Sequence, residues 1–228
     1  GKAASGIVTI SGKTYYFDGD GEMLTYGIHP VDGKIYISKS DGSVVEAKNN
    51  NWTYVDGKYY YVKDNAVLEN CVEKIGNAYY GFDYDGTMYD NRTFSISRYD
   101  EDNNYHNDTY RAKKDGALYV DEWYTDADSN RKYYYGNEGK AASGIVTISG
   151  KTYYFDYDGE MLAYGIHSVD GKNYISKSDG SVVEAKNNDW TKVEGKYYYV
   201  RDNVVLEHCV EKIGNAYYGF NDSGIMYD

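Results

Sequence analysis

Hydrophobic residues in this chain occur in short runs that are separated by glycine and by polar residues. The first run covers Ile7–Ile10, and it is followed by the turn-forming residues Ser11–Lys13 and by the aromatic run Thr14–Phe17. This order predicts a strand, a tight turn and a return strand. The same turn signal recurs at Asp32-Gly33 and Asp56-Gly57, where the backbone of a two-residue hairpin turn requires a positive φ. The pattern therefore predicts short antiparallel hairpins.

A common skeleton, Gly-x-x-Tyr-Tyr-apolar followed by an acidic residue with Gly or Asn and then an apolar residue, recurs along the whole chain. A single hairpin is only marginally stable in water, whereas a stack of hairpins can bury a continuous narrow core. We therefore predict an all-β fold, an elongated β-hairpin solenoid of about ten short repeats. The leading tyrosines of the ten repeats are Tyr15, Tyr36, Tyr60, Tyr79, Tyr110, Tyr134, Tyr153, Tyr174, Tyr198 and Tyr217.

A larger duplication organises these repeats. Residues 1–90 align with residues 139–228 without a gap, and 14 of the 90 aligned positions differ. We predict four hairpins in each block, divergent repeats in residues 91–138 between them, and one continuous solenoid overall. The polar segment 100–108 is an insertion in one of the divergent repeats, and it is predicted to be a protruding loop. Such a loop serves either as part of a working face or as a solvated spacer.

Composition and charge restrict the partners. The chain has 228 residues, of which 31 are Tyr and one is Pro, and its formal net charge is −12. A negative field of this size repels nucleic acid and anionic membrane surfaces, so neutral partners or partners with local positive groups are expected. No apolar run approaches the length of a membrane span. Because the chain begins and ends inside its own repeat pattern, we expect a monomeric fragment of a larger protein.

The sequence offers little catalytic chemistry. It contains no metal-binding His-Glu-x-x-His pair, no nucleophile elbow and no phosphate-binding loop. The acidic turns, such as Asp18–Gly21 and Asp83–Gly86, lack the further ligands of an EF-hand and are interpreted as ordinary turn chemistry. A nearly uniform array also presents the same groups many times, which suits multivalent binding better than one catalytic centre. We predict no enzyme activity, no cofactor and no metal.

The segment Gly-Lys-x-Tyr-Tyr-Phe-Asp-x-Asp-Gly-x-Met at 12–23 resembles the bacterial cell-wall-binding repeat. This superfamily includes choline-binding modules, the glucan-binding repeats of glucosyltransferases and the receptor-binding repeats of large clostridial toxins. The resemblance implies a β-hairpin solenoid that attaches a secreted or cell-surface protein, of a Gram-positive bacterium, to polysaccharide or wall polymer.

The resemblance also indicates candidate ligand residues. Choline-binding members carry a Trp that opens a hairpin and a Trp-Tyr-Tyr on its return strand, and these aromatics form a cage for a quaternary ammonium group. In this chain the opening Trp is retained in three repeats, in which the first aromatic of the return strand is Tyr. We predict that these three pairs bind a sugar ring or a cation; in the alternative, each Trp only fills the core. The pairs are Trp52 with Tyr59, Trp123 with Tyr133 and Trp190 with Tyr197.

Two functions remain open from the sequence. The first is a non-catalytic module that binds a glucan-like glycan or a choline-bearing cell-wall polymer through repeated aromatic sites. The second is a structural spacer or protein-interaction stalk without a small ligand, which the loss of most cage tryptophans favours.

Overall fold

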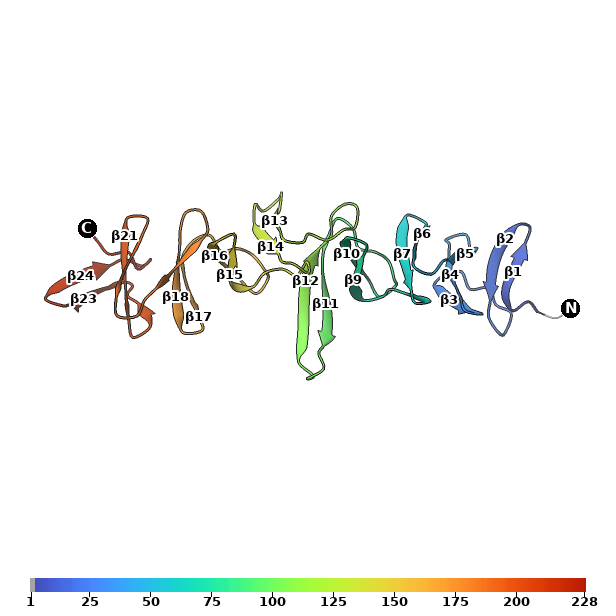
Figure 1. The fold of residues 1–228 in the computed structure, drawn as a ribbon, viewed down its shortest axis with the longest axis horizontal. Coiled ribbons are helices and arrows are strands. Elements are labelled where there is room, and N and C mark those ends of the chain that lie inside the picture. The colour runs from blue at the N-terminus through green and yellow to red at the C-terminus, as the bar shows by residue number, and fades with distance from the viewer. Residues whose placement is uncertain (1–2) are drawn as a thin grey trace. The chain divides into compact units, whose positions relative to one another are not determined.

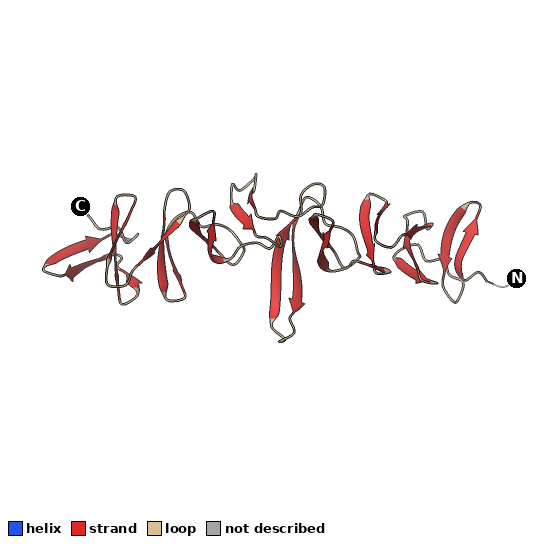
Figure 2. Ribbon diagram, viewed as in Figure 1, coloured by secondary structure: helices blue, strands red, loops and turns tan. Residues whose placement is uncertain are grey.

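The computed structural model describes residues 3–228, and all regular secondary structure in these residues is β-strand (Figures 1 and 2). The chain divides into two compact units, an N-terminal unit Gly1–Val120 and a C-terminal unit Asp121–Asp228. The strands of the N-terminal unit are β1 (Gly6–Ile10), β2 (Lys13–Phe17), β3 (Ile28–Val31), β4 (Lys34–Ser38), β5 (Val44–Ala47), β6 (Asn51–Val55), β7 (Lys58–Lys63), β8 (Ala66–Val67), β9 (Cys71–Ile75), β10 (Ala78–Phe82), β11 (Thr93–Tyr99) and β12 (Tyr105–Arg111). The strands of the C-terminal unit are β13 (Glu122–Thr125), β14 (Lys132–Tyr135), β15 (Gly144–Ile148), β16 (Lys151–Phe155), β17 (Ile166–Val169), β18 (Lys172–Ser176), β19 (Val182–Ala185), β20 (Trp190–Val193), β21 (Lys196–Arg201), β22 (Val204–Val205), β23 (Cys209–Ile213) and β24 (Ala216–Phe220).

The strands form ten small antiparallel sheets in the described residues. Each sheet contains one hairpin of consecutive strands, and four of the sheets add a short third strand. The prediction of an all-β chain of about ten hairpin repeats is therefore confirmed.

Local turn chemistry explains why the hairpins form where they do. Asp32 and Gly33 connect β3 to β4 with φ values of 49° and 74°, and Asp56 and Gly57 connect β6 to β7 with φ values of 49° and 85°. Two successive positive φ values define the turn whose twist matches that of the flanking strands. The Asp-Gly signal in the sequence thus fixes both the position and the geometry of these hairpins.

The acidic turns between hairpins satisfy their own backbone. The Asp18 carboxylate accepts hydrogen bonds from the N–H groups of Asp20 and Glu22, at 3.0 and 2.9 Å. The Asp83 carboxylate accepts the corresponding bonds from Asp85 and Thr87, at 3.0 and 2.8 Å. These carboxylates stabilise a turn, as the ordinary turn interpretation expects.

The core is divided into small clusters that lie between neighbouring hairpins. One cluster joins β4, β6 and β7 through Ile35, Ile37, Val55 and Val62 with their neighbours, and the duplicated block contains its counterpart. The counterpart of Ile35 is Asn173, a buried amide that donates to the Asn203 carbonyl oxygen at 2.9 Å and accepts from the Ser168 hydroxyl at 2.7 Å. The polar substitution is tolerated because both of these hydrogen bonds are formed.

The insertion at 100–108 is part of a hairpin and not a loop, which corrects the sequence-based prediction. Residues 105–108 belong to β12, which pairs with β11 over seven residue pairs, so the connecting turn is confined to residues 100–104. In the N-terminal unit this hairpin extends beyond its neighbours (Figure 2). This segment forms strands although it is polar, because its polar side chains hydrogen bond across the hairpin. The Ser97 hydroxyl, for example, donates to the Asn107 side-chain oxygen at 2.9 Å.

The equivalent histidines of the two blocks, His29 and His167, are expected to make the stability of the fold depend on pH. His29 and His167 are buried. The Nε2 atom of each ring forms one hydrogen bond with a serine hydroxyl, at 2.8 and 2.9 Å respectively. Burial lowers the pKa of both imidazoles. The unfolded chain therefore binds protons at a higher pH than the folded chain, and stability falls as the pH drops from about 6.5 towards the lowered pKa.

We expect the melting temperature to fall between neutral and mildly acidic pH, and the double variant His29→Gln/His167→Gln to show a smaller fall over this window. Circular dichroism melts measure both. Equal pH dependence in the two proteins would contradict this assignment, and the exposed His208 provides a control in the variant His208→Gln.

Candidate functional site

Trp52 and three tyrosines lie on one face of the hairpin β6–β7. Trp52 is directly opposite Tyr61 in the strand register, and Tyr54 is opposite Tyr59. Because side chains alternate between the faces of a strand, Tyr54, Tyr59 and Tyr61 project to the same side as Trp52. The ring centroid of Trp52 lies 5.1 Å from that of Tyr61 and 6.3 Å from that of Tyr59, in edge-to-face arrangements.

The next hairpin, β9–β10, completes the aromatic group. The Tyr80 ring lies 4.9 Å from Trp52 at an interplanar angle of 71°, and the buried Phe82 ring stacks on Trp52 at 6.0 Å. Met88 is placed beside them by its backbone N–H, which donates to the Tyr59 carbonyl oxygen at 2.8 Å. Trp52, Tyr59, Tyr80 and Met88, which we call the Trp52 cage, line a cavity of about 460 Å³ together with Asp90, Lys114 and Asp115.

Gly116 leaves the space into which Met88 extends. Its φ is +85°, and a Cβ atom at this position would lie 2.1 Å from the Met88 methyl carbon. Any other residue at position 116 would therefore displace Met88 from the cage. It would also strain the backbone, because a positive φ disfavours residues that carry a Cβ atom.

The duplicated block repeats the cage with nearly identical geometry. Trp190 lies 6.4 Å from Tyr197 and 5.0 Å from Tyr218, at interplanar angles of 86° and 71°. The Met226 N–H donates to the Tyr197 carbonyl oxygen at 2.9 Å. We call Trp190, Tyr197, Tyr218 and Met226 the Trp190 cage.

The third tryptophan has a different partner from the one that the sequence indicates. Trp123 is opposite Tyr134, and Tyr133 is opposite Tyr124, so Tyr133 projects to the other face of the hairpin β13–β14. The position that corresponds to Tyr59 is occupied by Lys132, which is opposite Thr125 and whose carbonyl oxygen accepts the Met161 N–H at 2.8 Å.

Trp123 nevertheless has aromatic neighbours. Its ring lies 5.3 Å from Tyr134, 5.1 Å from Tyr153 and 5.8 Å from the buried Phe155. This third site therefore has the tryptophan and the tyrosine of the next hairpin, but it has an ammonium group in place of the ring that Tyr59 and Tyr197 provide.

The structure thus brings together two of the three predicted pairs, Trp52 with Tyr59 and Trp190 with Tyr197. Sequence reasoning missed the contributions of the following hairpin, and it missed the role of Lys132. The available signals were the second Tyr of each Tyr-Tyr pair and the Met that follows each acidic turn. The missed cage residues are Tyr80, Met88, Tyr218 and Met226.

The tryptophans are not simple core residues. Trp52 and Trp190 are half-buried, and neither belongs to the buried clusters of its block. One face of each ring stacks on a buried phenylalanine, Phe82 or Phe220. The ring therefore closes the core on one side and forms a cage wall on the other.

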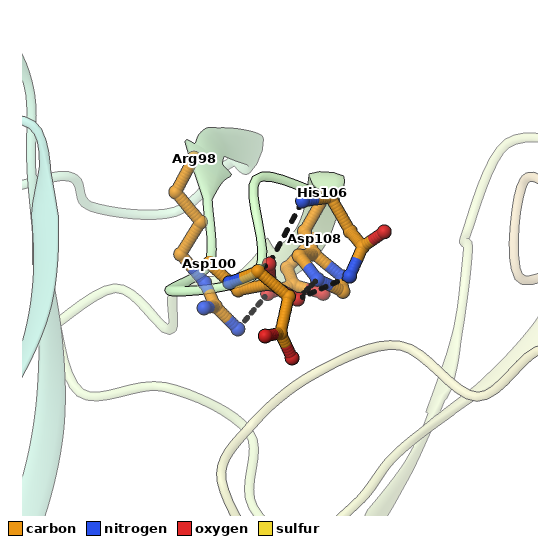
Figure 3. Close-up of polar contacts among 6 residues, drawn as sticks. Arg98, Asp100, His106 and Asp108 are labelled. Atoms are coloured by element: carbon orange, nitrogen blue, oxygen red, sulfur yellow. Dashed lines mark hydrogen bonds and ion pairs between the residues drawn. The ribbon is translucent and has the colours of Figure 1, made fainter.

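The tip of the hairpin β11–β12 holds a separate polar cluster (Figure 3). Asp100 is 2.8 Å from His106 Nε2 and accepts the Asn104 N–H at 2.8 Å, while Arg98 donates to Asp108 at 3.3 Å. The hydrogen bond from His106 and those from Asn104 hold the pKa of the Asp100 carboxyl well below its usual range. These contacts close the turn in the same way as the acidic turns elsewhere in the chain, so the cluster is explained by the stability of the hairpin tip.

Metal-binding clusters and membrane-spanning helices are both absent from residues 3–228. No group of three or more His, Cys, Asp or Glu side chains is arranged to hold a metal ion. No helix long and apolar enough to span a membrane occurs in this part of the chain.

Comparison with known proteins identifies similar sequences and structures. A family model described as "Putative cell wall binding repeat" matches residues 8–23 and 146–161. Glucosyltransferase-S of Streptococcus mutans serotype c is 29% identical over 204 residues, which are 89% of this chain and 13% of that protein. Glucosyltransferase-I of Streptococcus downei is 26% identical over 234 residues, which are 96% of this chain and 12% of that protein. The chain thus spans about an eighth of the length of these relatives.

Solved structures show the same fold. CbpF in complex with ipratropium superimposes with a TM-score of 0.58 at 20% identity, over 98% of this chain and 87% of that one. CbpF is choline binding protein F of Streptococcus pneumoniae. The chain is therefore a β-hairpin repeat protein in which residues 8–23 and 146–161 match the cell wall binding repeat, and it shares its fold with CbpF.

Proposed function

We propose that this chain is a non-catalytic binding module that attaches a larger secreted protein to a cell-wall polymer or polysaccharide. The observation that carries the proposal is the exact repetition of one aromatic cage in two blocks. The Trp-to-Tyr distance between neighbouring hairpins is 4.9 Å in the Trp52 cage and 5.0 Å in the Trp190 cage. Although the blocks differ at 14 of 90 positions, all four cage residues are the same in both.

The shape of the cages favours a quaternary ammonium group, such as the choline substituent of a wall polymer. The rings of Tyr59 and Tyr80 stand at 88° and 71° to that of Trp52, so they enclose a space from several sides. Aromatic faces attract a cation through the ring quadrupole, and a half-enclosed cation gains more because it is partly desolvated. Asp90, Asp115 and Lys114 at the rim carry a combined formal charge of one negative, which suits the same ligand.

The cage supplies binding groups and no reacting group. Its walls are aromatic rings and a thioether, which attract a ligand through dispersion and electrostatics. Two such sites on one chain gain avidity for a polymer with many substituents, because the second site binds at a high effective concentration. This arrangement supports attachment to a surface and requires no chemical step.

Alanine substitutions of the tryptophans test the proposal. Titration calorimetry of the whole chain with choline should show two sites, and Trp52→Ala or Trp190→Ala should each remove one. The double variant should bind choline at least about a hundredfold more weakly, since it loses the central wall of both cages. Retention on a choline-bearing wall preparation should fall together with the affinity.

Trp123→Ala is the matched control, because that site has Lys132 where the cages have a tyrosine. It should leave choline binding unchanged. Unchanged binding by a folded Trp52→Ala/Trp190→Ala variant, with an intact far-UV spectrum, would instead support a spacer or protein-interaction stalk.

A further inference from the structure

One position beside the cages carries a different side chain in each block. Tyr54 of the first block is replaced by Lys192 in the second, whereas the four residues of each cage are unchanged. Tyr54 lies opposite Tyr59 in the register of β6–β7, and Lys192 lies opposite Tyr197 in the register of β20–β21. Both side chains therefore project to the face of the hairpin that carries the cage tryptophan.

In the first block this position extends the aromatic group. The Tyr54 ring lies 4.7 Å from the Tyr59 ring, at an interplanar angle of 49°. Tyr54 is 60% exposed, and it brings no charge to this face of the hairpin. The quadrupole of the Tyr59 ring is therefore left available to a cation that enters the cage.

In the second block the chain places its own cation on a cage ring. The Lys192 Nζ atom lies 4.8 Å from the centroid of the Tyr197 ring. Within residues 3–228, this ammonium group takes part in none of the ion pairs, so no carboxylate neutralises it. A ring that already carries one cation attracts a second one less, and the two like charges repel each other.

We propose that Tyr54 and Lys192 give the two cages different affinities for a quaternary ammonium group, with the Trp52 cage as the stronger site. The inference rests on the proposed function, because it concerns the ligand of the same cages. The Trp190 cage is then occupied mainly after the polymer is held at the Trp52 cage, since this attachment raises the effective concentration of the remaining substituents.

The other differences between these hairpins place no charge on the cage face. Two exchanges keep the charge of the side chain, Asp56 with Glu194 and Lys63 with Arg201. A third exchange, of Asn51 for Asp189, adds a carboxylate, but this position precedes the tryptophan and projects to the opposite face. There each side chain accepts the N–H of the following tryptophan, at 2.9 and 2.8 Å.

Exchange of the two side chains tests the inference. Each cage is measured by titration calorimetry of the whole chain with choline, in a background that lacks the other tryptophan, Trp190→Ala or Trp52→Ala. The Trp52 cage should bind choline at least about threefold more tightly than the Trp190 cage. Tyr54→Lys should weaken the Trp52 cage by a similar factor, and Lys192→Tyr should strengthen the Trp190 cage. Because each cage is compared with itself, the charges at its rim are the same before and after the change.

Methionine variants separate the effect of charge from that of shape, because methionine is flexible like lysine but neutral. Lys192→Met should strengthen the Trp190 cage, and Tyr54→Met should weaken the Trp52 cage less than Tyr54→Lys does. Added salt should narrow the difference between the lysine and methionine forms of either cage, because salt screens the repulsion between exposed charges. The far-UV circular dichroism spectrum checks that every variant is folded.

Two kinds of negative result are distinguishable. If the two cages bind choline equally, or if the affinity of the Trp190 cage is the same in Lys192→Tyr, in Lys192→Met and in the unaltered chain, the roles of Tyr54 and Lys192 are overturned and the cages remain as choline sites. If the unaltered chain binds no choline at either cage, the proposed function fails, and this inference fails with it.

Discussion

The double variant Tyr59→Lys/Tyr197→Lys is expected to lose nearly all affinity for choline while it keeps its fold. The change removes one ring from each cage and places an ammonium group beside Trp52 and Trp190. A cation–π contact contributes about 0.5–2 kcal/mol per ring, and the repulsion between like charges adds to this loss. Because about 1.4 kcal/mol corresponds to a tenfold change in affinity, a loss of at least about a hundredfold is expected in titration calorimetry.

The fold should tolerate this change for two reasons. Tyr59 and Tyr197 are 46% and 38% exposed, so little buried surface is lost. The hairpin β13–β14, which carries Trp123, already has a lysine at the equivalent position, Lys132. Tyr59→Phe/Tyr197→Phe is the control that keeps the ring, and it should bind choline normally.

The reverse change, Lys132→Tyr, gives the site of Trp123 the missing ring. It should increase the number of choline sites per chain from two to three. Full choline affinity in Tyr59→Lys/Tyr197→Lys, with unchanged stoichiometry in Lys132→Tyr, would show that these cages do not bind ammonium groups.

Phe155→Ala is expected to cause the largest loss of stability of any single substitution considered. Its ring is 0% exposed and forms a small core cluster with Ile148 and Met161. Replacing a buried phenylalanine with alanine costs about 3–5 kcal/mol, because the cavity is only partly filled by relaxation. A small cluster offers few neighbours that could close such a cavity. Urea unfolding of the whole chain measures the change in the free energy of unfolding.

Tyr157→Ala is the matched control, because Tyr157 lies two residues further along the chain in the turn that follows β16. Tyr157 is 91% exposed, so its removal should change stability by no more than about 0.5 kcal/mol. Because repeats couple mainly to their nearest neighbours, hydrogen exchange in Phe155→Ala should accelerate first in β13–β16. A loss of stability equal to that of Tyr157→Ala would contradict the role of this cluster as a unit of the core.

The sequence by itself determined the hairpins. The Asp-Gly pairs at 32–33 and 56–57 place two-residue turns, and the aromatic runs after them form the return strands. These are local properties: the turn depends on adjacent backbone angles, and the strand pair that it closes involves residues within the same hairpin. For the same reason the pairs Trp52 with Tyr59 and Trp190 with Tyr197 were predictable, since each lies within one hairpin with a short turn.

The third pair was not predictable from the Tyr-Tyr pattern because the turn of its hairpin is longer. Val55 pairs with Lys58 across a turn of residues 56–57, whereas Thr125 pairs with Lys132 across residues 126–131. The longer turn changes which residue lies opposite each position, and a shift of one residue moves a side chain to the other face of the strand. Tyr133 therefore leaves the face of Trp123, and Lys132 takes the position that a tyrosine occupies in the cages.

Only the tertiary structure decided which residues of different hairpins meet. Tyr80 and Met88 reach Trp52 from the next hairpin, and Gly86 allows the turn after β10 to pack on β3. These contacts depend on how one hairpin packs on another, which no turn motif or strand period encodes. The physical reason is that the alternation of side chains along a strand fixes the face of each residue, whereas the neighbour on that face is fixed by packing between elements that are distant in the sequence.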